Sequence, residues 1–131
     1  METNKKTYKE VFNFIANANN YLKVHTDETK LKYAIERVGE KINKVTDAYY
    51  QKVKDLQLEH AFADEKGRVP FTIDEQGSRT YEYTKEGIKA LDKAIEELFN
   101  SEVDVEVYYA TELTEDAKPF EEVFKGFVIN A

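Results

Sequence analysis

Residues 28–62 read ETKLKYAIERVGEKINKVTDAYYQKVKDLQLEHAF, and this stretch decides the fold. Its apolar residues recur at steps of three and four places, which puts them on one face of a helix. They are Leu31, Ile35, Val38, Ile42, Val45, Tyr49 and Leu56, with Val53 one place beyond the regular spacing. We therefore predict one long helix over 28–62, which the rest of the chain covers.

The predicted helix is long for a chain of this size. At 1.5 Å per residue it spans about 50 Å. A compact domain of 131 residues has a diameter of roughly 35 Å. The helix must therefore bend, with Gly39 as the candidate position, or extend past its own domain and offer surface to a partner.

The flanks of the apolar face bear on what covers it. A two-stranded coiled coil usually carries charge at these positions. Here Lys41 and Asp55 are charged, whereas the other flanking residues are small or uncharged: Ala34, Gly39, Thr46, Ala48 and Val53. This pattern favours a wide face packed by several neighbours within the chain, and an intermolecular coiled coil remains the alternative.

The remaining segments predict an α+β fold that is mostly helical, with the order α-α-β-β-α-β-α and a small antiparallel sheet. Thr7 and Glu10 have the spacing of a capping box, and Thr26 or Asp27 is a candidate cap for the long helix. We predict a single domain over residues 1–131, with a helix at 8–21, the long helix at 28–62, a β-hairpin at 68–83, a helix at 85–99, an acidic strand at 102–109 and a short helix at 119–126.

The composition restricts the chemistry. The chain has no cysteine, so disulfides and thiolate metal sites are excluded. Its net charge of −7 is uneven, because residues 101–131 hold 2 Lys/Arg against 8 Asp/Glu. Such an acidic segment disfavours nucleic acid as a partner and favours basic protein surfaces. We expect a soluble protein with no secretory signal and no membrane segment.

Motifs of catalysis are missing from the sequence. It contains no phosphate-binding loop, no dinucleotide-binding glycine pattern and no G-x-S-x-G. The two histidines, His25 and His60, lie at opposite ends of the predicted long helix and have no ligand spacing. We therefore expect no enzymatic activity, no cofactor and no metal.

Tyrosine is abundant, with nine residues in the chain. The adjacent pairs Tyr49-Tyr50 and Tyr108-Tyr109 each predict one ring in the core and one ring outside. Outward tyrosines are typical of contact surfaces. We predict the candidate interaction surface from the following residues: Tyr50, Tyr108, Asp104, Glu106 and Phe127.

Three stretches carry a family resemblance. They are residues 30–35 (KLKYAI), residues 63–70 (ADEKGRVP) and residues 98–105 (LFNSEVDV). In these stretches the chain resembles a group of small uncharacterised proteins of tailed bacteriophages, over roughly residues 28–127. The resemblance implies a phage origin and a binding or structural role, and it implies no catalytic residues.

These observations favour a non-enzymatic phage accessory protein that acts by protein–protein contact, in the virion or in its assembly. The first alternative is an intracellular inhibitor whose acidic strand, with Asp104 and Glu106, binds a host or defence protein. The second is a sponge for a small ligand held between protomers. We expect a protein partner, a possible homo-oligomer, no nucleic acid and no membrane, and a location in the virion or the host bacterial cytoplasm.

Overall fold

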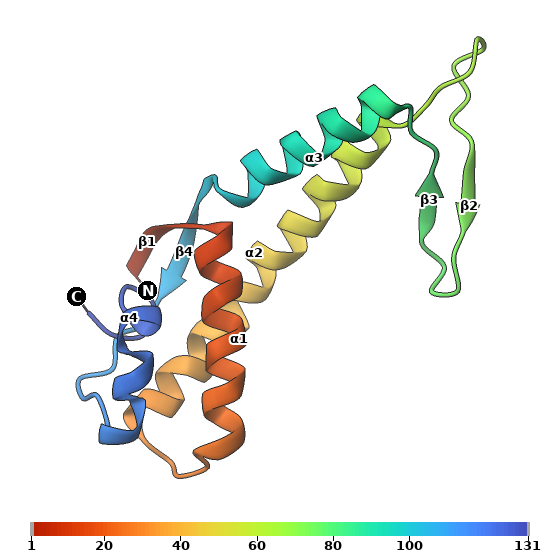
Figure 1. Ribbon diagram of the computed structural model, residues 1–131. Helices are drawn as coiled ribbons and strands as arrows, with labels where there is room; N and C mark the ends of the chain where they lie inside the picture. The colour runs from red at the N-terminus through yellow and green to blue at the C-terminus, as the bar shows by residue number, and fades with distance from the viewer. Residues whose placement is uncertain (1, 131) are drawn as a thin grey trace. The chain divides into compact units, whose positions relative to one another are not determined.

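The computed structural model describes residues 2–130 and has the predicted α+β character, mostly helical (Figure 1). Within these residues the strands form two separate two-stranded antiparallel sheets, β1 with β4 and β2 with β3. The elements are β1 (Glu2–Thr7), α1 (Tyr8–Val24), α2 (Lys30–His60), β2 (Phe71–Ile73), β3 (Arg79–Tyr81), α3 (Lys85–Phe99), β4 (Glu102–Val107), the 3-10 helix η1 (Glu115–Phe120) and α4 (Glu121–Phe124).

The sequence predicts a single domain, and the structure divides the chain into two compact units. Unit 1 comprises Met1–Ala48 and Asn100–Ala131, and unit 2 comprises Tyr49–Phe99. The helix α2 contributes to both, because its residues up to Ala48 belong to unit 1 and the rest to unit 2. Each unit is described separately below.

Unit 1 contains a well-filled core. Its centre is the aromatic ring of Phe14 on α1, which stacks on Phe127 with ring centroids 4.4 Å apart. Phe124 meets the same ring edge-on at 5.7 Å. The first part of α2 contributes the apolar face predicted from the sequence, and Leu31, Ile35, Val38 and Ile42 are all buried. The core therefore joins segments from both ends of the chain.

The strand β1 was not predicted from the sequence. Its residues are polar and lack the alternation that marks a strand, so nothing local distinguishes them from a flexible end. The strand forms because it pairs antiparallel with β4, with Lys5 opposite Asp104 and Thr3 opposite Glu106. The predicted acidic strand ends at Val107 rather than at residue 109.

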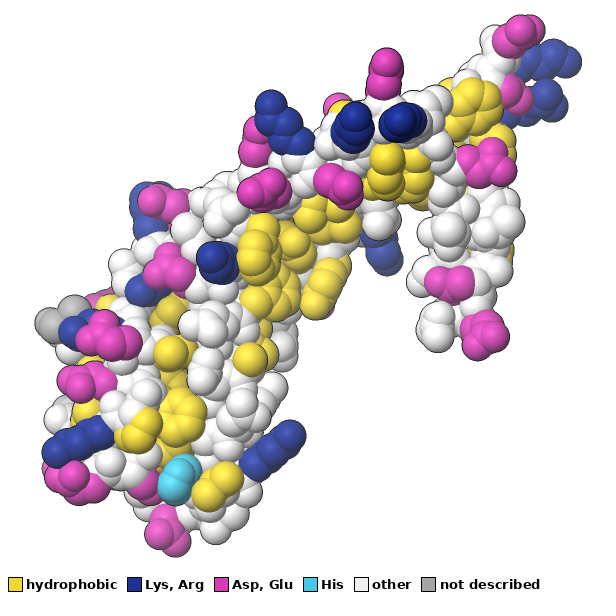
Figure 2. Space-filling model, in the orientation of Figure 1, with side chains coloured by type: hydrophobic (Ala, Val, Ile, Leu, Met, Phe, Trp, Pro, Cys, Tyr) yellow, Lys and Arg dark blue, Asp and Glu magenta, His cyan; other side chains and the backbone are white. Residues whose placement is uncertain are grey.

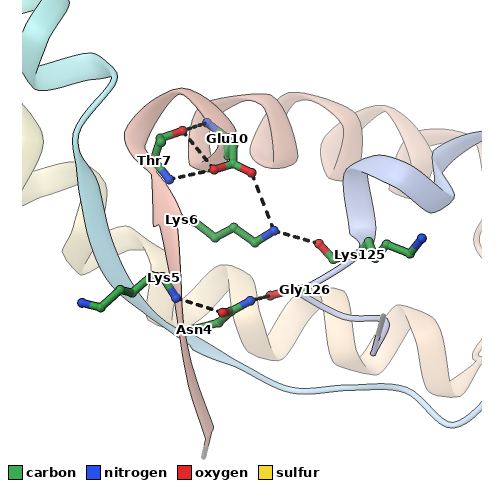
Figure 3. A network of polar contacts seen from close by, with 7 residues as sticks. All are labelled: Asn4, Lys5, Lys6, Thr7, Glu10, Lys125 and Gly126. Atoms are coloured by element: carbon green, nitrogen blue, oxygen red, sulfur yellow. Dashed lines mark hydrogen bonds and ion pairs between the residues drawn. The ribbon is translucent and has the colours of Figure 1, made fainter.

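The capping box predicted at the start of α1 is confirmed. The Glu10 amide donates to Thr7 Oγ1 at 3.1 Å, and the Thr7 amide donates to the Glu10 carboxylate at 2.9 Å (Figure 3). The helix continues three residues past its predicted end at 21, through the Asn-rich segment. There the side-chain amide of Asn17 donates to the Asn13 carbonyl oxygen at 2.8 Å, a bond compatible with the helix.

The long helix α2 begins two residues later than predicted and runs without interruption past Gly39. The predicted cap at Thr26 or Asp27 was wrong. The residue that caps is Thr29, whose hydroxyl oxygen accepts a hydrogen bond from the Lys32 amide at 3.1 Å. Threonine suits this position because its side chain satisfies an amide that has no partner within the helix.

Unit 2 holds the predicted hairpin and the predicted helix 85–99. The hairpin strands are short, three residues each. A pair of similar turns, at residues 64–68 and 74–78, follows one pattern: Asp64 Oδ1 accepts from the amides two and four residues on, and Asp74 Oδ1 does the same. Gly67 and Gly77 have φ of 78° and 80°, a conformation that glycine adopts without strain.

The helix α3 begins as predicted, with the Gly87 amide donating to Thr84 Oγ1 at 2.9 Å.

The predicted short helix at 119–126 is divided in the structure. The 3-10 helix η1 leads into α4, a single turn that ends before Gly126. Gly126 has φ of 80°, which confirms its predicted role in ending the helix. After Gly126 the chain runs beside residues 108–110, where the Ala110 amide donates to the Val128 carbonyl oxygen at 2.8 Å.

Candidate interaction surface

The structure exposes four of the five residues predicted to contact a partner. Tyr50 is 55% exposed and Tyr108 is 37% exposed. Asp104 and Glu106 are exposed on β4. Tyr50 belongs to unit 2, whereas the other three belong to unit 1. They are therefore treated as separate surfaces.

The prediction for Phe127 was wrong, because this residue is buried at 2% exposure. Its ring stacks on Phe14, and Lys6 Nζ lies 4.9 Å from the ring centroid. Lys6 Nζ also donates to the Lys125 carbonyl oxygen at 3.1 Å, and the Asn4 amide donates to the Gly126 carbonyl oxygen at 3.1 Å (Figure 3). These contacts tie β1 to the C-terminal segment, so Phe127 is a core residue.

The acidic strand is partly neutralised by its neighbour. Lys5 Nζ on β1 lies 3.2 Å from the Asp104 carboxylate, and both side chains are exposed to solvent. An exposed ion pair of this kind contributes little to stability, but it lowers the negative field along β4. Lys5 thus offsets part of the charge of Asp104, one of the two residues that the inhibitor hypothesis assigns to binding.

Tyr108 lies in a small aromatic cluster on unit 1. Its ring meets the ring of Tyr33 edge-on at 5.6 Å, and the Arg37 guanidinium carbon is 5.0 Å from its centroid. Arg37 also donates to the Tyr33 hydroxyl at 2.9 Å. These contacts hold the Tyr108 ring in one orientation. A ring that is already held loses little side-chain entropy when a partner binds to it.

Unit 2 contains a groove between α2 and the hairpin, with a volume of about 910 Å³. The side from α2 presents Tyr50, Val53, Lys54 and Gln57. The hairpin side presents Asp74, residues 77–81 and Tyr83. The groove thus brings three tyrosines together, Tyr50, Tyr81 and Tyr83. Spacing along the chain indicated the hairpin tyrosines, but only the folded unit places them beside Tyr50.

The charged side chains of this groove are not equivalent. The Asp74 carboxylate already accepts hydrogen bonds from the Gln76 and Ser78 amides, both at 2.9 Å. Arg79 lies over the ring of Phe71, 4.5 Å from its centroid, and Lys54 lies on the α2 side. Burial raises the pKa of the Tyr83 hydroxyl, which therefore stays neutral at physiological pH. The groove is aromatic with two basic side chains.

His25, in unit 1, contacts a carboxylate and an aromatic ring. His25 Nδ1 lies 2.8 Å from the Asp116 carboxylate, and its ring lies 4.4 Å from that of Tyr21. The pKa of Asp116 is lowered, first by the hydrogen bond from Thr114 and then by His25. No group of three or more histidine, aspartate and glutamate residues in this part of the chain is placed to hold a metal ion.

Exposed apolar side chains are concentrated in unit 2. Six of the nine large hydrophobic residues exposed among residues 2–130 lie there: Tyr50, Leu58, Phe62, Phe71, Ile73 and Ile88. In Figure 2 hydrophobic side chains gather along α3 and the adjoining part of α2. The number of exposed apolar side chains makes unit 2 the strongest candidate for contact with another protein. No helix between residues 2 and 130 is long and apolar enough to cross a membrane.

Comparison of the chain with protein-family models, with curated proteins and with solved structures gives no match. The function is therefore argued from the residues and their geometry.

Proposed function

We propose that this chain is a non-enzymatic accessory protein that acts by protein–protein contact, in a phage particle or in its assembly. The observation that carries the proposal is the concentration of exposed aromatic and aliphatic side chains in unit 2, together with a groove in the same unit that contains Tyr50, Tyr81 and Tyr83. Tyrosines in such a position bury a large area on binding at a low cost in side-chain entropy. The phage setting is supported by the three sequence stretches quoted above.

The groove suggests the chemistry of its partner. Lys54 and Arg79 contribute positive charge, and the carboxylate of Asp74 is engaged in its own turn. A matching partner segment carries acidic side chains beside aromatic or aliphatic ones. This local preference is opposite to the preference for basic partners that follows from the net charge of −7.

Two measurements test the proposal. Mass spectrometry of purified particles of the encoding phage is expected to detect the chain. In infected cells, a photo-crosslinking amino acid at Tyr81 is expected to capture a phage-encoded protein, and Arg79→Glu in the same chain is expected to abolish the capture. The same amino acid at Lys9, an exposed position on α1, is the matched control.

Each outcome has a defined meaning. Capture of a host protein at Tyr81, with Arg79→Glu abolishing it, would replace the virion role by the inhibitor role. Absence of the chain from particles, together with equal crosslinking at Tyr81 and Lys9, would contradict contact through the groove.

A further inference from the structure

The helix α3 has an apolar stripe, and α2 covers only part of it. One side of the stripe contains Gly87, Leu91 and Leu98. A Cβ added at Gly87 would lie 3.0 Å from the His60 backbone oxygen, so this side faces the end of α2. Leu91 on the same side is only 4% exposed. This part of the stripe is covered by other residues of unit 2.

The other side of the stripe contains Ile88, Ile95 and Phe99, which lie on one face of the helix because of their spacing. The ring of Phe99 lies 6.2 Å from that of Tyr49 on α2, so α2 covers the last turn of this side. Ile88 is 39% exposed and Ile95 is half-buried. In unit 2 only Tyr49 and Leu91 are buried apolar residues, so this 51-residue unit has a very small core of its own. A helix pair of this kind gains most of its stability when further helices cover the remaining apolar face.

Four exposed charged residues lie along the edge of this side, and their order indicates which orientation a neighbouring helix would take. Lys85 and Lys89 lie in the first half of α3, whereas Asp92 and Glu96 lie in the second half. The spacings of four, three and four places keep all four on one edge of the helix. A second α3 packed antiparallel along this side would bring the lysines of each helix to the carboxylates of the other. In a parallel two-fold pair the two copies of this edge would lie on opposite sides of the interface and could not pair with each other.

The C-terminal end of α3 is acidic. Its last turn contains Glu96 and Glu97 and no basic residue, whereas its first turn contains Glu86 beside Lys85. The helix dipole favours carboxylates at the start of a helix and cations at its end, so the acidic last turn is the unfavourable one. In an antiparallel pair the lysines of the neighbouring helix approach this acidic end.

From this pattern we infer that the Ile88–Ile95 side of α3 binds a second copy of this chain, antiparallel and with two-fold symmetry. The contact is isologous, since the same residues serve on both copies. It is separate from the tyrosine groove and does not depend on the proposed function.

The test uses the full chain and reciprocal charge reversal. By light scattering over about 1–200 µM, the wild type is expected to pass from 15.3 kDa to twice that mass. Lys85→Glu with Lys89→Glu makes the edge wholly acidic, and Asp92→Lys with Glu96→Lys makes it wholly basic. Each double variant alone is expected to raise the dimer dissociation constant at least about tenfold.

An equimolar mixture of the two double variants is expected to restore the dimer, which a folding defect would not do. The matched control is Lys9→Glu with Lys44→Glu, which changes the net charge equally at exposed positions of unit 1 and should leave the dimer intact. A wild type that stays monomeric throughout would overturn the inference, as would reversal variants that dimerise like the wild type.

Discussion

The two units contain apolar residues in similar proportion but bury them very differently. Unit 2 has 20 hydrophobic residues among 51, and unit 1 has 34 among 80. Of the 18 hydrophobic residues buried within residues 2–130, 16 lie in unit 1 and two in unit 2. Composition therefore does not decide where a core forms.

The difference follows from the number of elements that meet. In unit 1 two helices, a β-pair and the C-terminal turns surround one set of side chains, so their apolar faces are closed from several directions. In unit 2 a helix pair and a short hairpin supply the apolar faces, and a substantial part of them remains exposed. We infer that unit 1 provides the stability and unit 2 provides the surface for contacts.

The largest expected effect compares two positions on the same face of α2. Ile42 lies in unit 1 at 2% exposure, and Leu56 lies in unit 2 and is half-buried. We expect Ile42→Ala to lower the free energy of unfolding by about 2–5 kcal/mol, because it leaves a cavity in a filled core. Leu56→Ala should cost about 1 kcal/mol, since less apolar area is lost. Urea unfolding in dilute solution measures both, and equal costs would break the comparison.

The next effect concerns two glycines with the same backbone conformation. Gly126 and Gly77 both have φ of 80°, but a Cβ at Gly126 would lie 2.7 Å from Lys6 Nζ, and one at Gly77 meets nothing within 4 Å. Gly77→Ala should cost about 1 kcal/mol from backbone strain alone. Gly126→Ala should cost about 2 kcal/mol or more, because Lys6 must also move. Thermal unfolding of the two variants gives the difference, and a smaller cost at Gly126 would contradict the packing described for unit 1.

Hydrogen exchange tests the same comparison without substitution. Amides of α1 lie over a filled core, and those of α3 cover a small one. We expect α1 amides to exchange at least about tenfold more slowly than α3 amides in dilute solution. Addition of protein to dimer-forming concentration should slow exchange in α3 selectively. Uniform protection of both helices at low concentration would remove the distinction between the units.

The smallest expected effect is a pH dependence in unit 1. The hydrogen bond from the Thr7 amide, helped by Lys6, lowers the pKa of Glu10 below its ordinary value of 4.5. A lowered folded-state pKa stabilises the fold at neutral pH, and this contribution is lost as the pH falls below 4.5 through the folded-state value. Glu10→Gln should cost less than about 1 kcal/mol at pH 7, because the Glu10 side chain is half exposed. The difference between the two proteins should disappear as the pH falls below the folded-state pKa of Glu10, and a difference that is independent of pH would contradict the electrostatic origin.

The exposure of the candidate contact residues was predicted from the sequence only in part. An exposed Tyr50 and Tyr108 follow from adjacent tyrosine pairs, because neighbouring helix or strand positions point in different directions. Phe127 could not be assigned this way. Its apolar neighbours fit a core face equally well, and the residue that stacks on it, Phe14, is more than 100 positions away.

The sequence by itself determined the local elements: the long helix, the capping box of α1, the Thr84 cap, the glycine turns and the helix 85–99 depend on spacing and on side chains within a few residues. Only the tertiary structure decided the strand β1, the burial of Phe127, the pairing of Lys5 with Asp104 and the groove of three tyrosines. Each of these joins segments that are distant in sequence, and the polar residues 2–7 form a strand because β4 supplies the hydrogen-bonding partners that their own sequence lacks.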